Sequence, residues 1–182
     1  MKPIELLTGW VKGKYEGNLI RRSYEPYFNH LAAVAELASS ALSMGYEIGL
    51  CHDLLEDTST TRNELLEVLR GFGYTDSEAG HITSCVVELT DIFTAEAYPA
   101  LSKKQRKEKE ASRLNSISPD AQTVKYCDLI DNLKWVMQYD LRHASKYLSK
   151  KQLLLSAMTE GDRRIHQKAL DEVYRAWNTL TN

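Results

Sequence analysis

Nine consecutive residues carry the strongest chemical signal in this sequence: Gly49-Leu50-Cys51-His52-Asp53-Leu54-Leu55-Glu56-Asp57. In a helix, His52 lies one turn before Glu56. Asp53 lies one turn before Asp57 in the same way, so both pairs share nearly one face. The leucines between them predict burial, and buried carboxylates are costly unless a cation or hydrogen bonds compensate. A bound metal ion would offset the cost of burying these carboxylates. The alternative is an ordinary polar helix end, although acids at a helix C-terminus oppose its dipole.

Helical spacing of apolar residues dominates the chain around this segment, and strand-like alternation is nearly absent. We therefore predict an all-α fold. Helices are expected over residues 27–44, 48–55, 61–71, 77–90, 102–115, 118–139, 145–158 and 162–179. Gly45 is expected to end the first of them, and Thr61 with Glu64 resembles a capping box for the third. Residues 91–101 are expected to form a loop.

The composition is that of an ordinary globular protein: 182 residues, of which 43% are hydrophobic and 26% charged. We find no internal repeat and expect one domain over residues 1–182 with a full hydrophobic core. The formal net charge of -2 argues against a surface that binds nucleic acid or anionic lipid. A local cluster of basic residues could still bind an anionic ligand.

Neither a membrane span nor a disulfide framework is expected. No run of about 18 apolar residues occurs, and the segment Met1-Lys2-Pro3-Ile4-Glu5 has no apolar signal core. The three cysteines, Cys51, Cys85 and Cys127, are an odd number in apolar segments and show no CxxC spacing. A reducing compartment, the cytoplasm, is therefore the predicted location.

Two further helices place ligand-type side chains inside apolar patterns. His30 shares a helical face with Val34 and Leu37. A second polar stripe comprises Lys125, Asp128 and Asn132. Taken alone, a histidine on an apolar face is more often a satisfied core residue than a ligand. A polar stripe alone is usually the solvated face of an amphipathic helix.

Together the three segments form a His…His-Asp…Asp pattern. This pattern resembles the motif of the HD superfamily of metal-dependent phosphohydrolases. The resemblance implies that His30, His52, Asp53 and Asp128 bind one divalent cation. Two imidazoles and two carboxylates favour Mn²⁺, with Fe, Co, Ni or Zn as alternatives. The remaining histidines are His81, His143 and His166. They sit in no second-metal motif and are expected to be ordinary surface or core residues.

A narrower resemblance involves Glu25-Pro26-Tyr27 before His30, the segment from His52 to Thr58, and Asn132 after Asp128. These residues look like the hydrolase domain of RelA/SpoT enzymes and their small stand-alone relatives. Those enzymes remove the 3′-pyrophosphate from guanosine tetra- and pentaphosphate (ppGpp and pppGpp). The resemblance implies a single-domain helical bundle with its core motifs in 21–136. The C-terminal helices over 145–179 lie outside the resemblance. They either cap the core or form a dimer face, so a homo-oligomer is one of the two alternatives.

The same resemblance implies roles for further residues. Glu56 and Asp57 would orient water and move protons. The substrate-binding candidates are Arg21, Arg22, Ser23, Arg106, Lys125 and Asn132. The basic run Lys103–Lys109, which contains Arg106, is either a solvated helix face or a rim that steers phosphate.

Several positions depart from the family pattern and leave the substrate open. Tyr24 stands where glycine is common, Leu31 replaces a proline, and Lys134-Trp135 replace a small polar residue. The leading hypothesis is a pyrophosphohydrolase acting on a guanosine polyphosphate. The alternatives are a nucleotide phosphatase or phosphodiesterase of the same superfamily, and a catalytically silent nucleotide-binding module. Each takes a small-molecule nucleotide as its partner, with no nucleic acid and no membrane.

Overall fold

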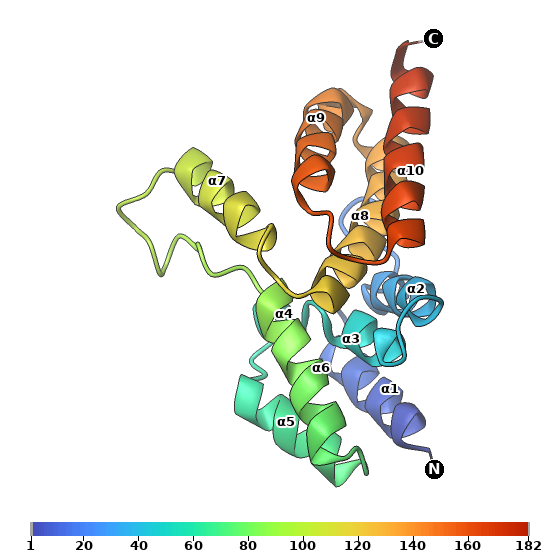
Figure 1. The fold of residues 1–182 in the computed structure, drawn as a ribbon, viewed down its shortest axis with the longest axis vertical. Helices are drawn as coiled ribbons and strands as arrows, with labels where there is room; N and C mark the ends of the chain where they lie inside the picture. Colours follow the sequence, from blue (N-terminus) through green and yellow to red (C-terminus); the bar gives the residue numbers. More distant parts are fainter. Residues whose placement is uncertain (1, 182) are drawn as a thin grey trace.

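The computed structural model describes residues 2–181, and within this range the chain forms ten helices. They are α1 (Pro3–Lys14), α2 (Phe28–Ser39), α3 (Gly45–Cys51), α4 (Leu54–Asp57), α5 (Arg62–Gly71), α6 (Asp76–Leu89), α7 (Lys103–Leu114), α8 (Pro119–Tyr139), α9 (Leu141–Ala157) and α10 (Arg163–Thr181) (Figure 1). Pairing of extended backbone in residues 2–181 is limited to an isolated bridge between Leu19 and Pro26. The all-α prediction is confirmed. Across the same residues, no helix combines the length and apolar character needed to span a membrane.

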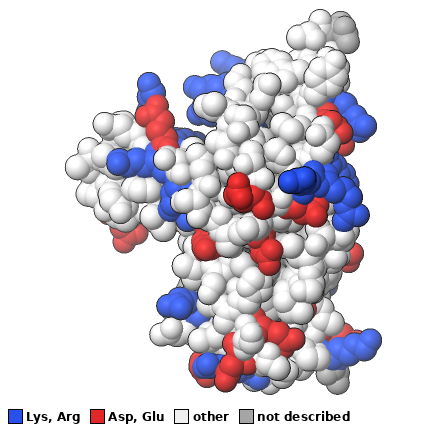
Figure 2. All heavy atoms as spheres, viewed as in Figure 1, with Lys and Arg blue, Asp and Glu red and all other residues white. Residues whose placement is uncertain are grey.

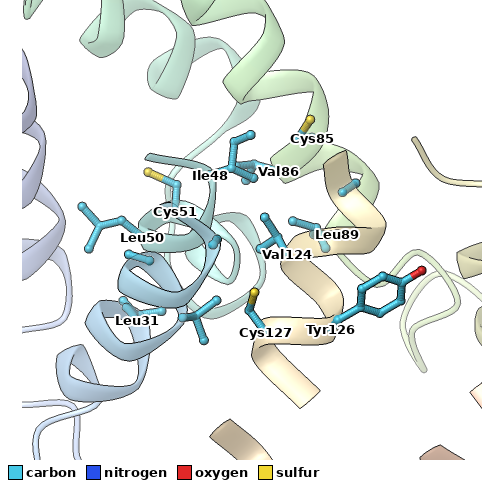
Figure 3. Close-up of a cluster of buried hydrophobic side chains, with 14 of the residues drawn as sticks. Leu31, Ile48, Leu50, Cys51, Cys85, Val86, Leu89, Val124, Tyr126 and Cys127 are labelled. Atoms are coloured by element: carbon cyan, nitrogen blue, oxygen red, sulfur yellow. The ribbon is translucent and has the colours of Figure 1, made fainter. Parts of the chain in front are cut away.

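Helix α8 is the centre of the fold. It packs against α2, α3, α6, α9 and α10, and in Figure 1 it links the α9–α10 pair to the rest of the bundle. Leu31, Ile48, Val86 and Val124 come from α2, α3, α6 and α8 and lie in one cluster (Figure 3). This cluster extends through all ten helices, so the described chain shares one hydrophobic core.

Helices α2 and α3 approach so closely that their backbones touch. A Cβ atom on Gly49 would lie 2.7 Å from the Cα atom of Ala35, which is closer than side-chain carbon atoms approach one another. Gly45 faces the backbone of Ala38 in the same way. The two glycines therefore set the spacing of α2 and α3, which carry the predicted ligands His30 and His52.

The prediction that Gly45 ends a helix is wrong. Helix α2 ends at Ser39, and Gly45 is the first residue of α3, where its contact with Ala38 excludes a side chain. The expected helix over 48–55 is also divided, because Asp53 leaves helical geometry between α3 and α4 with φ −101° and ψ 2°. Helix α1 was not expected at all.

The expected capping box at Thr61 is only half formed. The Thr61 hydroxyl accepts a hydrogen bond from the Glu64 backbone N–H, as an N-cap should. The Glu64 carboxylate, however, accepts from Lys14 Nζ at 2.8 Å and so ties α5 to α1. The helices expected over 77–90, 102–115, 118–139, 145–158 and 162–179 are all present, with ends that differ by at most four residues.

The loop over 91–101 and helix α7 together form an arm, residues 91–114, that projects from the bundle (Figure 1). Glu110 fixes its base, because Oε2 accepts from the backbone N–H groups of Ile92 and Phe93 at 3.1 Å. Its Oε1 accepts from Arg113 at 2.6 Å, and Arg113 also donates to the carbonyl of Glu88 at 2.8 Å. Figure 2 shows lysine and arginine side chains on the arm beside acidic ones, and charges of both signs over the rest of this face.

Candidate metal centre and active site

The four predicted metal ligands lie together at the meeting point of α2, α3 and α8. We call His30, His52, Asp53 and Asp128 the central cluster. His30 is in the first turn of α2, His52 caps the end of α3, Asp53 follows it in the turn before α4, and Asp128 is at the middle of α8. His30, His52 and Asp128 are 6%, 1% and 6% exposed, so the cluster is almost closed to solvent.

The donor atoms of the central cluster converge on one point. His52 Nε2 lies 3.1 Å from Asp53 Oδ2 and 3.8 Å from Asp128 Oδ1. His30 Nε2 lies 3.4 Å from Asp128 Oδ1 and 3.8 Å from Asp53 Oδ2. Donor atoms of His30, His52 and Asp53 all fall within 4.8 Å of one another. The two imidazole rings meet edge to face at 5.2 Å, which leaves both Nε2 atoms directed at the carboxylates.

The other ring nitrogens determine which atoms are available to a cation. His52 Nδ1 lies 2.7 Å from the Gly49 carbonyl oxygen, so Nδ1 donates and Nε2 presents its lone pair. Among residues 2–181, this buried Nε2 has no hydrogen-bond partner. An orphaned imidazole nitrogen beside a second imidazole and two carboxylates is a donor set that fits a divalent transition metal.

The electrostatics of the central cluster also favour bound positive charge. Burial alone lowers the pKa of each imidazole. The neighbouring carboxylates outweigh this: hydrogen bonds to Asp128 and Asp131 raise the pKa of His30 to about 9, and the negative charge of Asp53 raises that of His52 to about 10. Burial raises the pKa of Asp53, but the charge of His52 reverses this and holds that pKa below its ordinary value. A divalent cation would supply the same positive charge in place of these protons.

Several groups hold the carboxylates of the cluster in place. The Tyr27 hydroxyl donates to Asp53 Oδ2 at 2.7 Å. Lys125 Nζ lies 2.8 Å from Asp128 Oδ2, and the Asn132 amide donates to Asp128 Oδ1. Two of the predicted substrate residues, Lys125 and Asn132, therefore contact a predicted metal ligand. Tyr27 belongs to the Glu25-Pro26-Tyr27 motif, but nothing in the sequence pattern indicates its contact with Asp53.

The predicted acid–base pair lies on α4, beside the central cluster. Glu56 Oε2 accepts a hydrogen bond from the Asp91 backbone N–H at 3.3 Å. Partial desolvation, together with the negative charge of Asp91, raises the pKa of Glu56. Partial desolvation and the charge of Asp53 raise the pKa of Asp57. Raised carboxyl pKa values suit groups that exchange protons near neutral pH.

The segment Arg21-Arg22-Ser23 is fastened to the end of α8. The Arg22 guanidinium pairs with Asp140 at 2.9 Å and lies 5.9 Å from the Trp135 ring centroid. The Trp135 indole donates to the Arg21 carbonyl oxygen at 3.1 Å. Ser23 Oγ accepts from the Glu25 backbone N–H at 3.4 Å. Arg22 is thus engaged within the chain, whereas the Arg21 side chain is exposed.

Tyr24, which departs from the family pattern, has the backbone geometry of a glycine. Its φ is 59°, in the left-handed region that L-residues rarely adopt, and its side chain is 75% exposed. Arg106 lies apart from the central cluster on α7, where it donates to the Leu101 carbonyl within the arm. The structure therefore brings Lys125 and Asn132, but not Arg106, to the cluster.

Helix α9 contributes two residues that sequence reasoning missed. The Tyr147 hydroxyl is buried and has no hydrogen-bond partner in the part of the chain that the structure describes. Lys151 Nζ lies 5.2 Å from the Tyr147 ring centroid. Burial, reinforced by the charge of Lys125, lowers the pKa of Lys151 to about 8. We call these two residues the α9 wall. Their spacing of one helical turn was visible in the sequence, but nothing there showed which element they face.

The other histidines lie outside the central cluster. His81 pairs with Asp120 at 3.0 Å, and His143 pairs with Asp140 at 2.9 Å. His166 Nε2 donates to the Leu155 carbonyl at 2.8 Å. Each of the three has a protein partner of its own, so none is available to a second metal in the central cluster.

Comparison with family models and with curated protein sequences finds no match. Among solved structures, one of a metazoan ortholog of SpoT, which hydrolyzes ppGpp and plays a role in starvation responses, is similar to this chain. The TM-score is 0.77 at 18% sequence identity, and the match covers 99% of this chain and 97% of that chain. At this coverage α9 and α10, which the sequence resemblance left out, belong to the shared fold. The chain therefore shares the helical fold of this SpoT ortholog over nearly its full length.

Proposed function

We propose that this chain is a metal-dependent phosphohydrolase of the HD type that acts on a nucleotide. One observation carries the proposal: two imidazole Nε2 atoms and two carboxylates converge in a nearly closed site, and the His52 Nε2 is buried without a partner among residues 2–181. A silent binding module would have no need of this donor set together with the two acids on α4. A guanosine polyphosphate, cleaved at its 3′-pyrophosphate, is the favoured substrate.

The central cluster would hold one divalent cation, with Mn²⁺ favoured over Fe, Co, Ni or Zn for this mixture of nitrogen and oxygen donors. When bound, such an ion activates water near neutral pH and screens the charge of the phosphoryl group. The Tyr27 hydroxyl orients Asp53, and Lys125 with Asn132 orients Asp128. These contacts are expected to keep the carboxylates in position during turnover.

Glu56 and Asp57 would act as the acid–base pair. Both are on α4, and both have raised pKa values. Glu56, which is anchored by the Asp91 backbone N–H, would accept a proton from the attacking water. Asp57 lies nearer to the charge of Asp53 and would help to orient that water. General acid–base catalysis of this kind typically contributes about 10²–10⁴ in rate.

The substrate side of the site would be basic and rich in hydrogen-bond donors. Lys125 and the α9 wall carry two ammonium groups and a hydroxyl that has no partner in the described part of the chain. Phosphate oxygens are the acceptors that best satisfy such donors. We also propose Arg21 and Ser23 as contacts to the nucleotide, and Arg106 as a steering charge on the arm. The engaged Arg22 would act chiefly by holding this segment.

The sulfur chemistry fits the cytoplasm. Cys51, Cys85 and Cys127 are buried free thiols, and burial raises the pKa of each of them. Protonated, buried thiols are inert and persist in a reducing compartment.

A product assay tests the proposal. The purified chain is loaded with Mn²⁺ and incubated with ppGpp, nucleoside triphosphates and cyclic nucleotides, and pyrophosphate and orthophosphate are measured separately. We expect pyrophosphate from ppGpp, and no product from a His52→Ala control. Release of orthophosphate alone, or of a nucleoside monophosphate from a cyclic nucleotide, would favour the phosphatase or phosphodiesterase. The departures at Tyr24 and Trp135 keep that second candidate open. Metal binding with no product from any nucleotide would refute the proposed enzymatic activity.

A further inference from the structure

We propose that Asp131 is a positioning residue that orients His30 for metal binding. This inference rests on the proposed function. Asp131 lies on α8, and its Oδ2 is 2.8 Å from His30 Nδ1. Its other oxygen, Oδ1, lies 3.3 Å from Lys134 Nζ. Both carboxylate oxygens are therefore engaged, and the side chain is fixed between the two partners.

The contact determines which nitrogen of His30 is available. A carboxylate can only accept a hydrogen bond, so the Nδ1 atom that faces it carries the proton. Nε2 then directs its lone pair at the carboxylates of Asp53 and Asp128, at 3.8 and 3.4 Å. Without an acceptor at Nδ1, the ring could rotate or adopt the other tautomer, in which Nε2 carries the proton and cannot bind metal.

The two histidines of the central cluster are oriented by different acceptors. His52 Nδ1 donates to a neutral group, the Gly49 carbonyl oxygen, whereas His30 donates to an anion. A carboxylate acceptor makes the opposite nitrogen of the imidazole more basic, and residues in this position are often as important as the ligands themselves. We therefore infer that His30 is the stronger metal ligand of the two and owes this to Asp131.

The placement of Asp131 allows a clean test, because it lies across the imidazole ring from the convergent donor atoms. It borders a surface cavity between α2, α8 and α10, which Lys134, Lys168 and Glu172 also line. Substitution of Asp131 therefore leaves Asp53 and Asp128 untouched and acts on the metal only through His30.

The test is the affinity of the chain for Mn²⁺ alone, measured by calorimetry with no nucleotide present. Asp131→Ala is expected to weaken Mn²⁺ binding by about 10–100-fold. Asp131→Asn keeps an acceptor oxygen but loses the charge that makes Nε2 more basic, so we expect it to recover only part of the affinity and still to bind Mn²⁺ more weakly than the unsubstituted chain, beyond a two-fold difference. The matched control is Asp120→Asn, since Asp120 is also on α8 and contacts a histidine, His81, at 3.0 Å. It is expected to bind Mn²⁺ like the unsubstituted chain.

The outcomes separate this inference from the proposed function. Thermal unfolding with a chelator present shows whether each variant is folded, and if Asp131→Ala is not, the loss of affinity in Asp131→Asn alone is the test. Tight Mn²⁺ binding by the unsubstituted chain and by folded Asp131 variants alike, within two-fold, would overturn the role of Asp131 and leave the metal centre standing. Absence of Mn²⁺ binding by the unsubstituted chain would overturn both.

Discussion

Substitution of Lys151 by methionine should make the free chain more stable and its substrate binding weaker. Burial, reinforced by the charge of Lys125, lowers the pKa of Lys151 from 10.5 to about 8. At neutral pH this fall corresponds to about 3 kcal/mol against the protonated side chain in the folded state. Methionine has a similar length and no charge, so it removes this cost. We expect the free energy of unfolding to rise by up to about 3 kcal/mol, with imperfect packing as the reason for any shortfall.

The gain in stability should depend on pH in a defined direction. Because the pKa of folded Lys151 lies below that of the unfolded side chain, the folded state binds fewer protons between about pH 8 and 10.5. The stability of the unsubstituted chain therefore rises with pH across this window. The advantage of Lys151→Met is full below about pH 8 and shrinks toward pH 10.5. Thermal unfolding at pH 7 and pH 10 measures it, at about 2–4 °C for each kcal/mol.

The same substitution should weaken the binding of an anionic nucleotide. A hydrogen bond from an ammonium to phosphate contributes about 1.5–3 kcal/mol, which corresponds to a rise in Kd of about 10–100-fold. Lys150→Met, at the exposed neighbouring position on α9, is the control and should change neither property. If Lys151→Met is no more stable than the unsubstituted chain at pH 7, the argument from desolvation is refuted. If it is more stable and binds nucleotide equally well, Lys151 has no role in the substrate site.

Three further predictions concern different parts of the chain. Glu56→Gln should keep Mn²⁺ binding and lower kcat by about 10²–10⁴, and a near-normal kcat in the product assay would remove Glu56 from the mechanism. Gly49→Ala should lower the free energy of unfolding by about 1–3 kcal/mol or more, since the new Cβ would meet the Ala35 backbone at 2.7 Å; an unchanged urea midpoint contradicts this. Glu110→Ala should speed limited proteolysis within 91–101, because it removes the acceptor of two backbone N–H groups at the base of the arm. An equal cleavage rate, with Mn²⁺ affinity unchanged in both chains, would show that Glu110 does not hold the arm.

The helical fold was predictable where the information is local. Apolar periodicity located most helices, and helix ends such as that of α8, where the Ser118 hydroxyl accepts from the Ala121 N–H, depend on neighbouring residues alone. Gly45 was misjudged because its role is not local: it permits contact with Ala38 in another helix. Helix α1 was missed although Leu7 and Val11 are buried one turn apart. Its glycines lower helix propensity, and only packing against the bundle outweighs that.

The candidate site was predictable to the extent that its residues form a recognisable pattern. Such a pattern predicts His30, His52, Asp53 and Asp128, and in the structure each imidazole Nε2 lies within 3.8 Å of an oxygen of both aspartates. Their role as ligands stays a prediction. The contact between Asp131 and His30 joins residues 101 positions apart. In the sequence this aspartate is one acid in a mixed helix, and its role depends on a helix crossing that local spacing does not encode.

Helix α8 and the C-terminal helices together explain why the site needs the whole chain. Asp128, Asn132 and Asp131 all project from α8, so the direction of this one helix sets the distances at the central cluster. The C-terminal segment fixes that direction, because the buried Tyr126 hydroxyl of α8 donates to the Met158 carbonyl at 2.8 Å. The α9 wall is part of the same segment. Helices α9 and α10 are therefore more than a cap over a finished core. They hold α8, which presents the proposed metal ligand Asp128, and α9 supplies the Lys151 ammonium group that would face the substrate.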